Sequence, residues 1–203
     1  MDGMRVTTGH SRVRETSDRI LEEAGELAQE RGFNGFSYAD VAAALRITKA
    51  SLHYHFATKA ELGRALIVRY TERFQAALDA LEGTPANMLR MYVKLYEDVL
   101  VRDRMCLCGM FAAEYSTLPG PMRNELRRFF DKNEAWLARH LEQGRANGDI
   151  QYEGSPVEMA RMLTAGLEGA MLLARSFEQP ERFSATAERL LAELAVARRR
   201  KRS

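Results

Sequence analysis

Apolar residues recur at intervals of three and four along most of this chain, within stretches rich in Ala, Leu, Glu and Arg. That spacing is typical of amphipathic helices and differs from the alternation of a half-buried strand. The five prolines, at 85, 119, 121, 156 and 180, separate helix-forming stretches of the second half. The pattern predicts an all-α protein, with helices near 12–31, 38–45, 49–56, 59–82, 86–103, 107–117, 122–147, 157–177 and 183–200.

Residues that begin and end helices support several of these elements independently. Gly32 follows the first helix, where a glycine commonly ends one. Thr58 with Glu61, and Ser155 with Glu158, have the spacing of capping boxes, and Pro156 occupies the first helical position of the second box. In addition, we expect two hydroxyl residues to cap the two short helices: Ser37 and Thr48.

Length and composition indicate a globular chain that builds its own core. The chain has 203 residues, of which 46% are hydrophobic and 29% charged, and its mean hydropathy is −0.36. No apolar run approaches the roughly 18 residues that a membrane span needs. The N-terminus lacks the basic and apolar regions of a secretory signal. We therefore expect a cytoplasmic protein with no membrane partner.

Positive charge is clustered although the formal net charge is only +2. Residues 44–59 contain Arg46, Lys49 and Lys59, two histidines and no acidic residue, and a second basic run occupies 198–202. Clustering of this kind is a feature of nucleic-acid binding, although a basic C-terminal tail is equally common as a solvated end.

The two short helices within 38–56 are joined by only a few residues around 45–48, which is helix-turn-helix spacing. Ten apolar residues can close a small core between these helices and the first one: Ile20, Leu21, Ala24, Leu27, Ala28, Val41, Ala42, Leu45, Ile47 and Leu52. Small, hydroxylic, aromatic and basic residues of the second short helix then face outward and suit a DNA groove. Spacing alone also allows an ordinary corner of a helical protein that does not read DNA.

The same region resembles a known family. Ala24, Gly32-Phe33, Phe36-Ser37 and the run ITKASLHYHFATKAEL over 47–62 resemble the DNA-binding domain of tetracycline-repressor-like (TetR/AcrR) transcriptional regulators. The resemblance covers about residues 12–62. It implies a homodimer that binds a palindromic operator in double-stranded DNA. It also implies a flexible arm over 1–11, a three-helix helix-turn-helix domain over 12–58, and a helical effector-binding and dimerisation domain over 59–203.

On this resemblance, nine residues are expected to form the DNA-binding surface: Ser37, Thr48, Lys49, Ala50, Ser51, His53, Tyr54, His55 and Lys59. The chain departs from the common family pattern twice, with His53 where tyrosine is frequent and Arg46 where glycine is frequent. The N-terminal arm carries four basic residues that either reach a minor groove or stay disordered: Arg5, His10, Arg12 and Arg14.

The helix predicted over 157–177 is apolar around most of its circumference, with small residues interspersed. Such a helix must be buried on more than one side, and small residues permit close helix approach. By resemblance, this helix and the one over 183–200 form an isologous four-helix dimer interface; the alternative is an internal core helix. The predicted interface residues are Leu163, Gly166, Leu167, Ala170, Leu190 and Leu194.

Residues for an effector pocket are harder to select, because a pocket and a core use the same side chains. Nine candidates lie in the helices that enclose the cavity of the family, and each of them also suits plain core: Phe74, Tyr92, Tyr96, Met110, Phe111, Tyr115, Trp136, Met162 and Met171. Glu114 and Glu168 lie in largely apolar helices, where each either meets a cationic or hydroxylated ligand or pairs with a nearby arginine.

Two cysteines, Cys106 and Cys108, are too few for a disulfide framework. They lie at the start of a predicted helix beside Arg102 and Arg104, which favours a reactive thiol. Some members of the resembled family respond to electrophiles or oxidants through a cysteine at this helix start. The alternative to a redox switch is a small buried side chain. Their spacing disfavours a mutual disulfide or a zinc site.

Three classes of function compete. With four histidines, no Glu-x-x-His pair in the second half and no glycine-rich phosphate loop, the sequence offers no constellation for catalysis and predicts no cofactor or metal. An interaction protein that kept the helix-turn-helix shape is the second rival. We expect a DNA-binding repressor that leaves its operator when an effector occupies or modifies the C-terminal domain.

Overall fold

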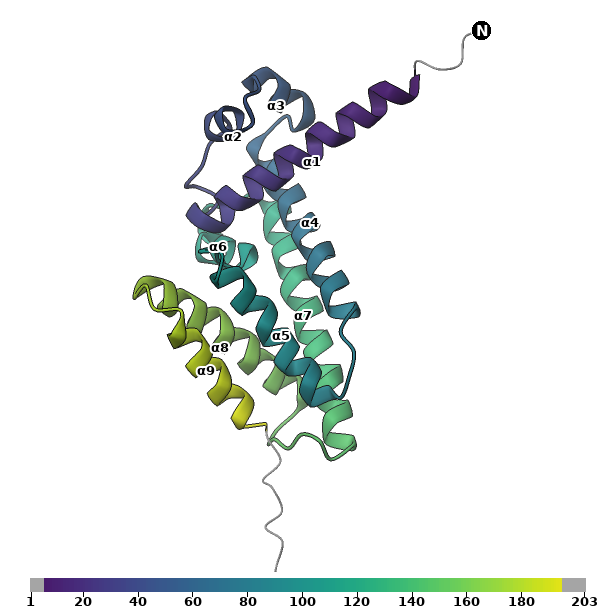
Figure 1. The fold of residues 1–203 in the computed structure, drawn as a ribbon, viewed down its shortest axis with the longest axis vertical. Helices are drawn as coiled ribbons and strands as arrows, with labels where there is room; N and C mark the ends of the chain where they lie inside the picture. Colours follow the sequence, from purple (N-terminus) through teal and green to yellow (C-terminus); the bar gives the residue numbers. More distant parts are fainter. Residues whose placement is uncertain (1–5, 195–203) are drawn as a thin grey trace, which may run out of the picture. The chain divides into compact units, whose positions relative to one another are not determined.

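The computed structural model describes the backbone of residues 6–194 and the side chains of residues 13–194. Over this range the chain forms nine α-helices and one 3₁₀ turn, with no β-strand (Figure 1). These are α1 (Val6–Arg31), α2 (Tyr38–Leu45), α3 (Lys49–His55), α4 (Lys59–Asp79), α5 (Pro85–Leu100), α6 (Leu107–Ala113), η1 (Tyr115–Thr117), α7 (Gly120–Ala146), α8 (Pro156–Ser176) and α9 (Glu181–Ala192). The predicted all-α class is confirmed.

Several predicted helix ends are confirmed. Gly32 ends α1 in the left-handed region, at φ 78°, and its N–H donates to the carbonyl of Ala28. Ser155 and Glu158 form the predicted capping box at the start of α8. At the start of α4, Thr58 Oγ1 accepts from the Glu61 N–H as predicted, whereas the Glu61 carboxylate reaches one residue further back, to the Ala57 N–H.

Helix α1 begins at Val6, six residues before the predicted start. The apolar pattern did not mark this extension. Arg5, the side chains of His10 and Arg12, and the basic run over 198–202 lie outside the described residues. None of the described helices is long and apolar enough to cross a membrane.

The chain divides into two compact units. The N-terminal unit comprises the chain up to Thr71 together with Leu107–Leu126, and the C-terminal unit comprises Glu72–Cys106 together with the chain from Arg127 onward. The N-terminal unit is therefore larger than the domain expected over 12–58. The beginnings of α4 and α7, together with α6, pack with α1–α3.

Named contacts within the N-terminal unit explain this addition. The ring of Phe111 packs edge-on against Phe33 at 5.7 Å between centroids, and Arg64 forms a 2.9 Å ion pair with Glu125. Gly63 lies so close to Met122 that a Cβ there would come within 2.6 Å of the Met122 side chain. Contacts of this kind, between residues 50 or more positions apart, leave no mark in a local sequence pattern.

The C-terminal unit is built around aromatic packing. Phe74 contacts Tyr92, Tyr96 and Phe129 edge-on, with centroids 5.6–5.9 Å apart, and Tyr92 stacks on Trp136 at 5.6 Å. Helices α8 and α9 pair along their length in this unit (Figure 1). The pair is joined by a tight turn that includes Glu178, a residue with φ 53°.

Candidate nucleic-acid interface

Helices α2 and α3 are separated by only residues 46–48, as helix-turn-helix geometry requires. Arg46 takes the left-handed conformation, φ 55° and ψ 41°, and the Ile47 N–H reaches back 3.0 Å to the carbonyl of Ala42. This is the 6→1 bond of a Schellman motif. Thr48 Oγ1 then caps α3 by accepting from the Ser51 N–H at 3.1 Å. Backbone hydrogen bonds therefore close the turn, although its left-handed position holds an arginine where glycine would be less strained.

A small core holds the two helices on α1. Leu52 of α3 and Val41 of α2 are completely buried, as are Ile20 and Ala24 of α1. Leu27, Ala28 and Ala42 are also buried, whereas three other members of the predicted core are only partly buried: Leu21, Leu45 and Ile47. Because Leu52 points inward, the neighbouring positions of α3 face away from the core.

The outward side of α3 carries the predicted DNA-facing residues. Tyr54 is 76% exposed, more than any other large hydrophobic side chain that the structure describes in this unit. Lys49, Ala50, His53 and the N-cap Thr48 are exposed as well, and Ser51 and His55 are partly buried. The Tyr54 and His55 rings meet edge-on at 5.3 Å. The structure brings these seven residues onto one short helix and its cap.

The end of α3 is tied to α2 by two side chains. The Tyr38 hydroxyl donates to the Phe56 carbonyl at 2.8 Å, and burial together with the nearby Glu61 raises the pKa of Tyr38 to about 12. The His53 ring lies 4.7 Å from the Tyr38 ring, and its Nδ1 is 3.1 Å from the Ala57 carbonyl. These contacts fix the direction in which α3 leaves the turn.

Lys59 and Ser37 have internal partners. The Lys59 ammonium donates to the carbonyls of Phe33 and Phe36 and lies 4.5 and 4.6 Å from their ring centroids. Burial lowers its pKa. Ser37 donates through both N–H and Oγ to Asp40. A groove of about 340 Å³ between α2 and α3 is lined by these two residues and by Tyr38, Ala39, Lys49 and His53.

The nine residues proposed for an effector pocket are divided between the two units. Met110, Phe111 and Tyr115 belong to the N-terminal unit and the other six to the C-terminal unit. Met162 is 43% exposed on α8, so it points away from the core of its unit. Tyr92, Tyr96, Trp136 and Met171 are buried among neighbouring side chains.

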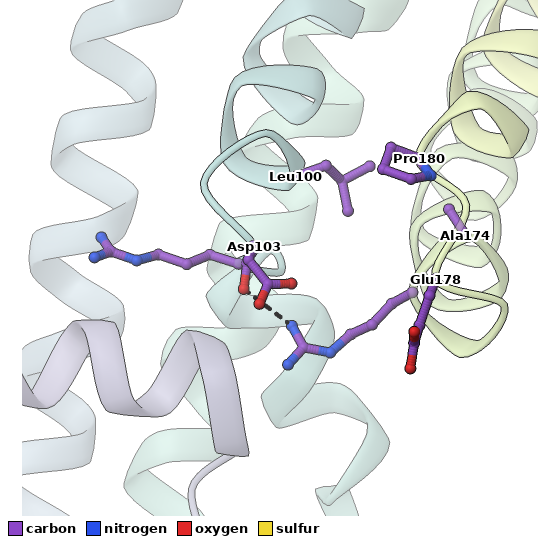
Figure 2. A pocket seen from close by; sticks show the side chains of 7 residues that line it. Leu100, Asp103, Ala174, Glu178 and Pro180 are labelled. Carbon is purple, nitrogen blue, oxygen red and sulfur yellow. Dashed lines mark hydrogen bonds between the residues drawn. The ribbon is translucent and has the colours of Figure 1, made fainter.

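The C-terminal unit contains a pocket that the sequence did not reveal. Its volume is about 420 Å³, and it is lined by Leu100, Asp103, Arg104, Ala174, Arg175, Glu178 and Pro180. In Figure 2, Leu100 and Pro180 point toward one another across it, and a dashed line marks the 3.4 Å bond from an arginine, Arg175, to the Asp103 carbonyl. Two of its lining residues, Asp103 and Glu178, take the left-handed conformation in the turns after α5 and α8, which no sequence pattern indicated.

Glu168 lies on α8, near the pocket-lining residues of that helix. Along α8, the pocket residue Arg175 is two turns from Glu168. The two residues that hydrogen-bond to Glu168 are also near pocket residues in the chain. Tyr96 is one turn from Leu100 on α5, and Cys106 is two residues from Arg104. Burial raises the pKa of the Glu168 carboxyl from 4.5 to about 7, although hydrogen bonds from Cys106 and Tyr96 favour its ionised form. Its Oε1 is shielded from solvent and has no hydrogen-bond partner.

Neither acidic residue takes the arginine partner considered for it. Glu114 accepts from the backbone N–H groups of Phe33 and Asn34, with its Oε2 2.6 Å from the Phe33 nitrogen. The Glu114 carboxylate therefore satisfies backbone N–H groups in the segment that links α1 to α2. Glu168 takes hydroxyl and thiol donors, as described above.

Both cysteines are buried, and neither forms a disulfide. Cys106 is 2% exposed and hydrogen-bonds to the Glu168 carboxyl. A reactive thiol is normally partly exposed and surrounded by positive charge. The burial of both thiols agrees with the alternative given for them, small side chains buried in the core. Among the described residues, no cluster of His, Cys, Asp and Glu could hold a metal ion.

The residues predicted for the dimer interface need correction. Leu163, Leu167, Ala170 and Leu194 are buried within the chain itself, so a partner cannot reach them. A Cβ on Gly166 would meet Leu190 of α9 at 2.8 Å, which shows that the small residue serves the packing of α8 on α9. The opposite side of α8 is exposed and apolar, with Met162, Leu172, Leu173 and Phe177 each at least 43% exposed. The sequence identified the helix but not the side of it.

Comparisons with known proteins agree with the helix-turn-helix geometry. Residues 20–66 match the family of bacterial regulatory proteins called the tetR family, and residues 85–190 match a tetracyclin repressor-like C-terminal domain. Since these matches span more than half of the chain, the protein belongs to the TetR family.

Individual relatives are transcriptional regulators. The chain is 28% identical over 169 residues to the transcriptional regulator AcuR of Cereibacter sphaeroides, covering 80% of this chain and 77% of AcuR. It is 27% identical over 192 residues to the HTH-type transcriptional repressor NemR of Escherichia coli K12, covering 90% and 96%. A TetR-family regulator from Agrobacterium tumefaciens has the same fold, with TM-score 0.88, 31% identity, and 91% and 100% coverage. The protein is thus a DNA-binding transcriptional regulator, in a family of regulators rather than enzymes.

Proposed function

We propose that this protein is a homodimeric repressor that binds a palindromic operator in the cytoplasm and leaves it when an effector occupies the C-terminal unit. The observation that carries the DNA part is the outward side of α3. Tyr54, His53 and Lys49 are exposed there, while Leu52 anchors the same helix in the core. A rigid helix with exposed donors and aromatic groups is the arrangement that reads a major groove.

The proposal assigns different tasks to the nine predicted residues. Lys49, Ser51, His53, Tyr54 and His55 contact the DNA directly, and Ala50 lets the helix approach closely. Thr48 caps α3, and its exposed side chain also lies near the phosphates. Ser37 and Lys59 act mainly by holding the segment before α2, because their polar atoms already have internal partners.

Dimerisation is proposed through the exposed side of α8. Met162, Gly169, Leu172 and Leu173 follow one another at helical spacing on this side, and a Cβ on Gly169 would meet nothing within 4 Å in its own chain. An exposed apolar stripe of this length on a soluble domain marks an interaction surface. Two copies of the same stripe can meet around a two-fold axis, as a palindromic site requires.

The effector is proposed to enter through the 420 Å³ pocket and to reach Glu168. The unpartnered Oε1 supports a small molecule that offers a hydrogen-bond donor, such as a hydroxyl or amine. Residues 59–71 of α4 belong to the N-terminal unit and 72–79 to the C-terminal one, so this helix can carry a change from one to the other. Screening hydroxylated and amine compounds for DNA release tests this; equal release from wild type and Glu168→Gln would contradict it.

Fluorescence anisotropy tests the DNA part of the proposal. The probe is duplex DNA from immediately upstream of the gene of this protein, compared with a shuffled duplex of the same composition. We expect tighter binding to the upstream duplex, and an affinity that falls steeply with salt because bound cations are released from the phosphates.

Lys49→Ala and Tyr54→Ala should abolish the preference for the upstream duplex, whereas Lys132→Ala, which removes an exposed lysine of α7, should not. Binding that does not change with salt would instead support a helical interaction protein. If Lys49→Ala and Tyr54→Ala kept wild-type affinity, the assignment of α3 would be wrong.

A further inference from the structure

The proton on the His53 ring has a fixed position. Nδ1 lies 3.1 Å from the carbonyl oxygen of Ala57, which can only accept a hydrogen bond. Nδ1 must therefore carry the hydrogen. The ring cannot turn without losing this bond and its contact with the Tyr38 ring, whose own hydroxyl is held by the Phe56 carbonyl.

In the neutral ring, the other nitrogen is consequently an acceptor. On a neutral imidazole with hydrogen on Nδ1, Nε2 presents a lone pair and no hydrogen. His53 is exposed and lines the groove between α2 and α3 beside Lys49. Lysine is donor-only, so the two neighbours offer DNA opposite hydrogen-bonding characters.

The major groove contains few partners for such an acceptor. Phosphate oxygens, guanine N7 and O6, and thymine O4 only accept, and would face the Nε2 lone pair unfavourably. The donors are the exocyclic amines, N6 of adenine and N4 of cytosine. A neutral His53 therefore distinguishes amino bases from keto bases on the strand that it faces.

We infer that His53 is a specificity-determining residue that accepts a hydrogen bond from the exocyclic amine of an adenine or cytosine in each half-site. The inference rests on the proposed function, because it requires α3 to lie in the major groove. The tyrosine that is frequent at this position in the family would bring a hydroxyl, which can donate as well as accept. The histidine therefore restricts the bases that this position can bind to those with an exocyclic amine.

The test is selection of binding sites from a library of random duplexes by the full-length protein and two variants. His53→Asn retains a side-chain N–H that can donate to the Ala57 carbonyl, but its only acceptor, Oδ1, takes the place of ring Cδ2, so no acceptor remains at the position of Nε2. His53→Phe retains the ring contact with Tyr38 but has neither nitrogen. We expect wild type to enrich a palindrome in which one position per half-site is adenine or cytosine.

In both variants the enrichment of adenine or cytosine at that position should fall about fivefold, while the preferences at the other positions should stay the same. Replacing the preferred adenine by nebularine, which lacks only the exocyclic amine, should weaken wild type about fivefold and leave His53→Asn unchanged; zebularine serves similarly for cytosine. An unchanged profile in both variants overturns the inference while the proposed function stands. A loss spread evenly over all positions in folded variants assigns His53 a purely structural role, and failure of wild type to enrich any site overturns both.

Discussion

The buried carboxyl of Glu168 makes a quantitative prediction about stability. Its pKa rises from 4.5 to about 7 in the folded chain because burial disfavours the charged form. Between these two pH values the folded state holds a proton that the unfolded state has released, so the free energy of unfolding falls as the pH rises through this window. A shift of this size corresponds to about 3 kcal/mol, as an upper limit.

Replacing Glu168 with Gln removes the titration, keeps a side chain of similar shape, and retains a carbonyl oxygen that can accept from Tyr96 and Cys106. We expect the variant to have nearly wild-type stability near pH 5 and to gain up to about 3 kcal/mol relative to wild type by pH 8. Urea unfolding at fixed protein concentration, followed through Trp136 and through helical circular dichroism, measures this difference.

The difference between variant and wild type cancels the titration of every other group that the mutation does not disturb. Glu188→Gln, on the exposed side of α9, is the matched control and should reproduce the wild-type profile. A Glu168→Gln difference that stays constant from pH 5 to pH 8 would refute the argument, because the carboxyl would then titrate alike in the folded and unfolded chains.

Three further mutations test the packing argument. Leu173→Glu should convert a dimer to a monomer in sedimentation experiments, whereas Ala80→Glu, a charge at an exposed site after α4, should not; a dimer that survives Leu173→Glu contradicts the proposed interface. Lys59→Met should lower the free energy of unfolding by about 2 kcal/mol, because two carbonyls lose their donor; unchanged stability with lost DNA binding would mean that the lysine serves DNA instead. Arg46→Gly should add about 1 kcal/mol by relieving the left-handed backbone, and a loss of stability would show that the arginine side chain supplies a contact.

The helices and the helix-turn-helix could be predicted because their causes are local. Periodicity places Leu52 inward, Thr48 and Ser155 cap the helices that follow them, and Gly32 ends α1. These features depend on residues within one or two turns of one another. The same local signals also placed the exposed residues of α3.

The remaining features depend on distant residues. Helix α8 is apolar on two sides, and its sequence does not say which side meets its own chain and which is left exposed. Glu114 and Glu168 have similar settings in sequence, yet the first caps a backbone 80 residues away and the second is enclosed by Tyr96 and Cys106. Lys59 matched a family position of the DNA-binding domain, but in the structure its ammonium donates to the backbone carbonyls of Phe33 and Phe36.

Hydroxyl-radical footprinting on the DNA upstream of the gene tests the central claim, that the outward side of α3 reads an operator. The account predicts two related protected half-sites, with centres one helical turn or a multiple of it apart, and loss of both on Tyr54→Ala while Lys132→Ala leaves them intact. Protection without sequence preference, or protection that Tyr54→Ala leaves unchanged, would contradict it.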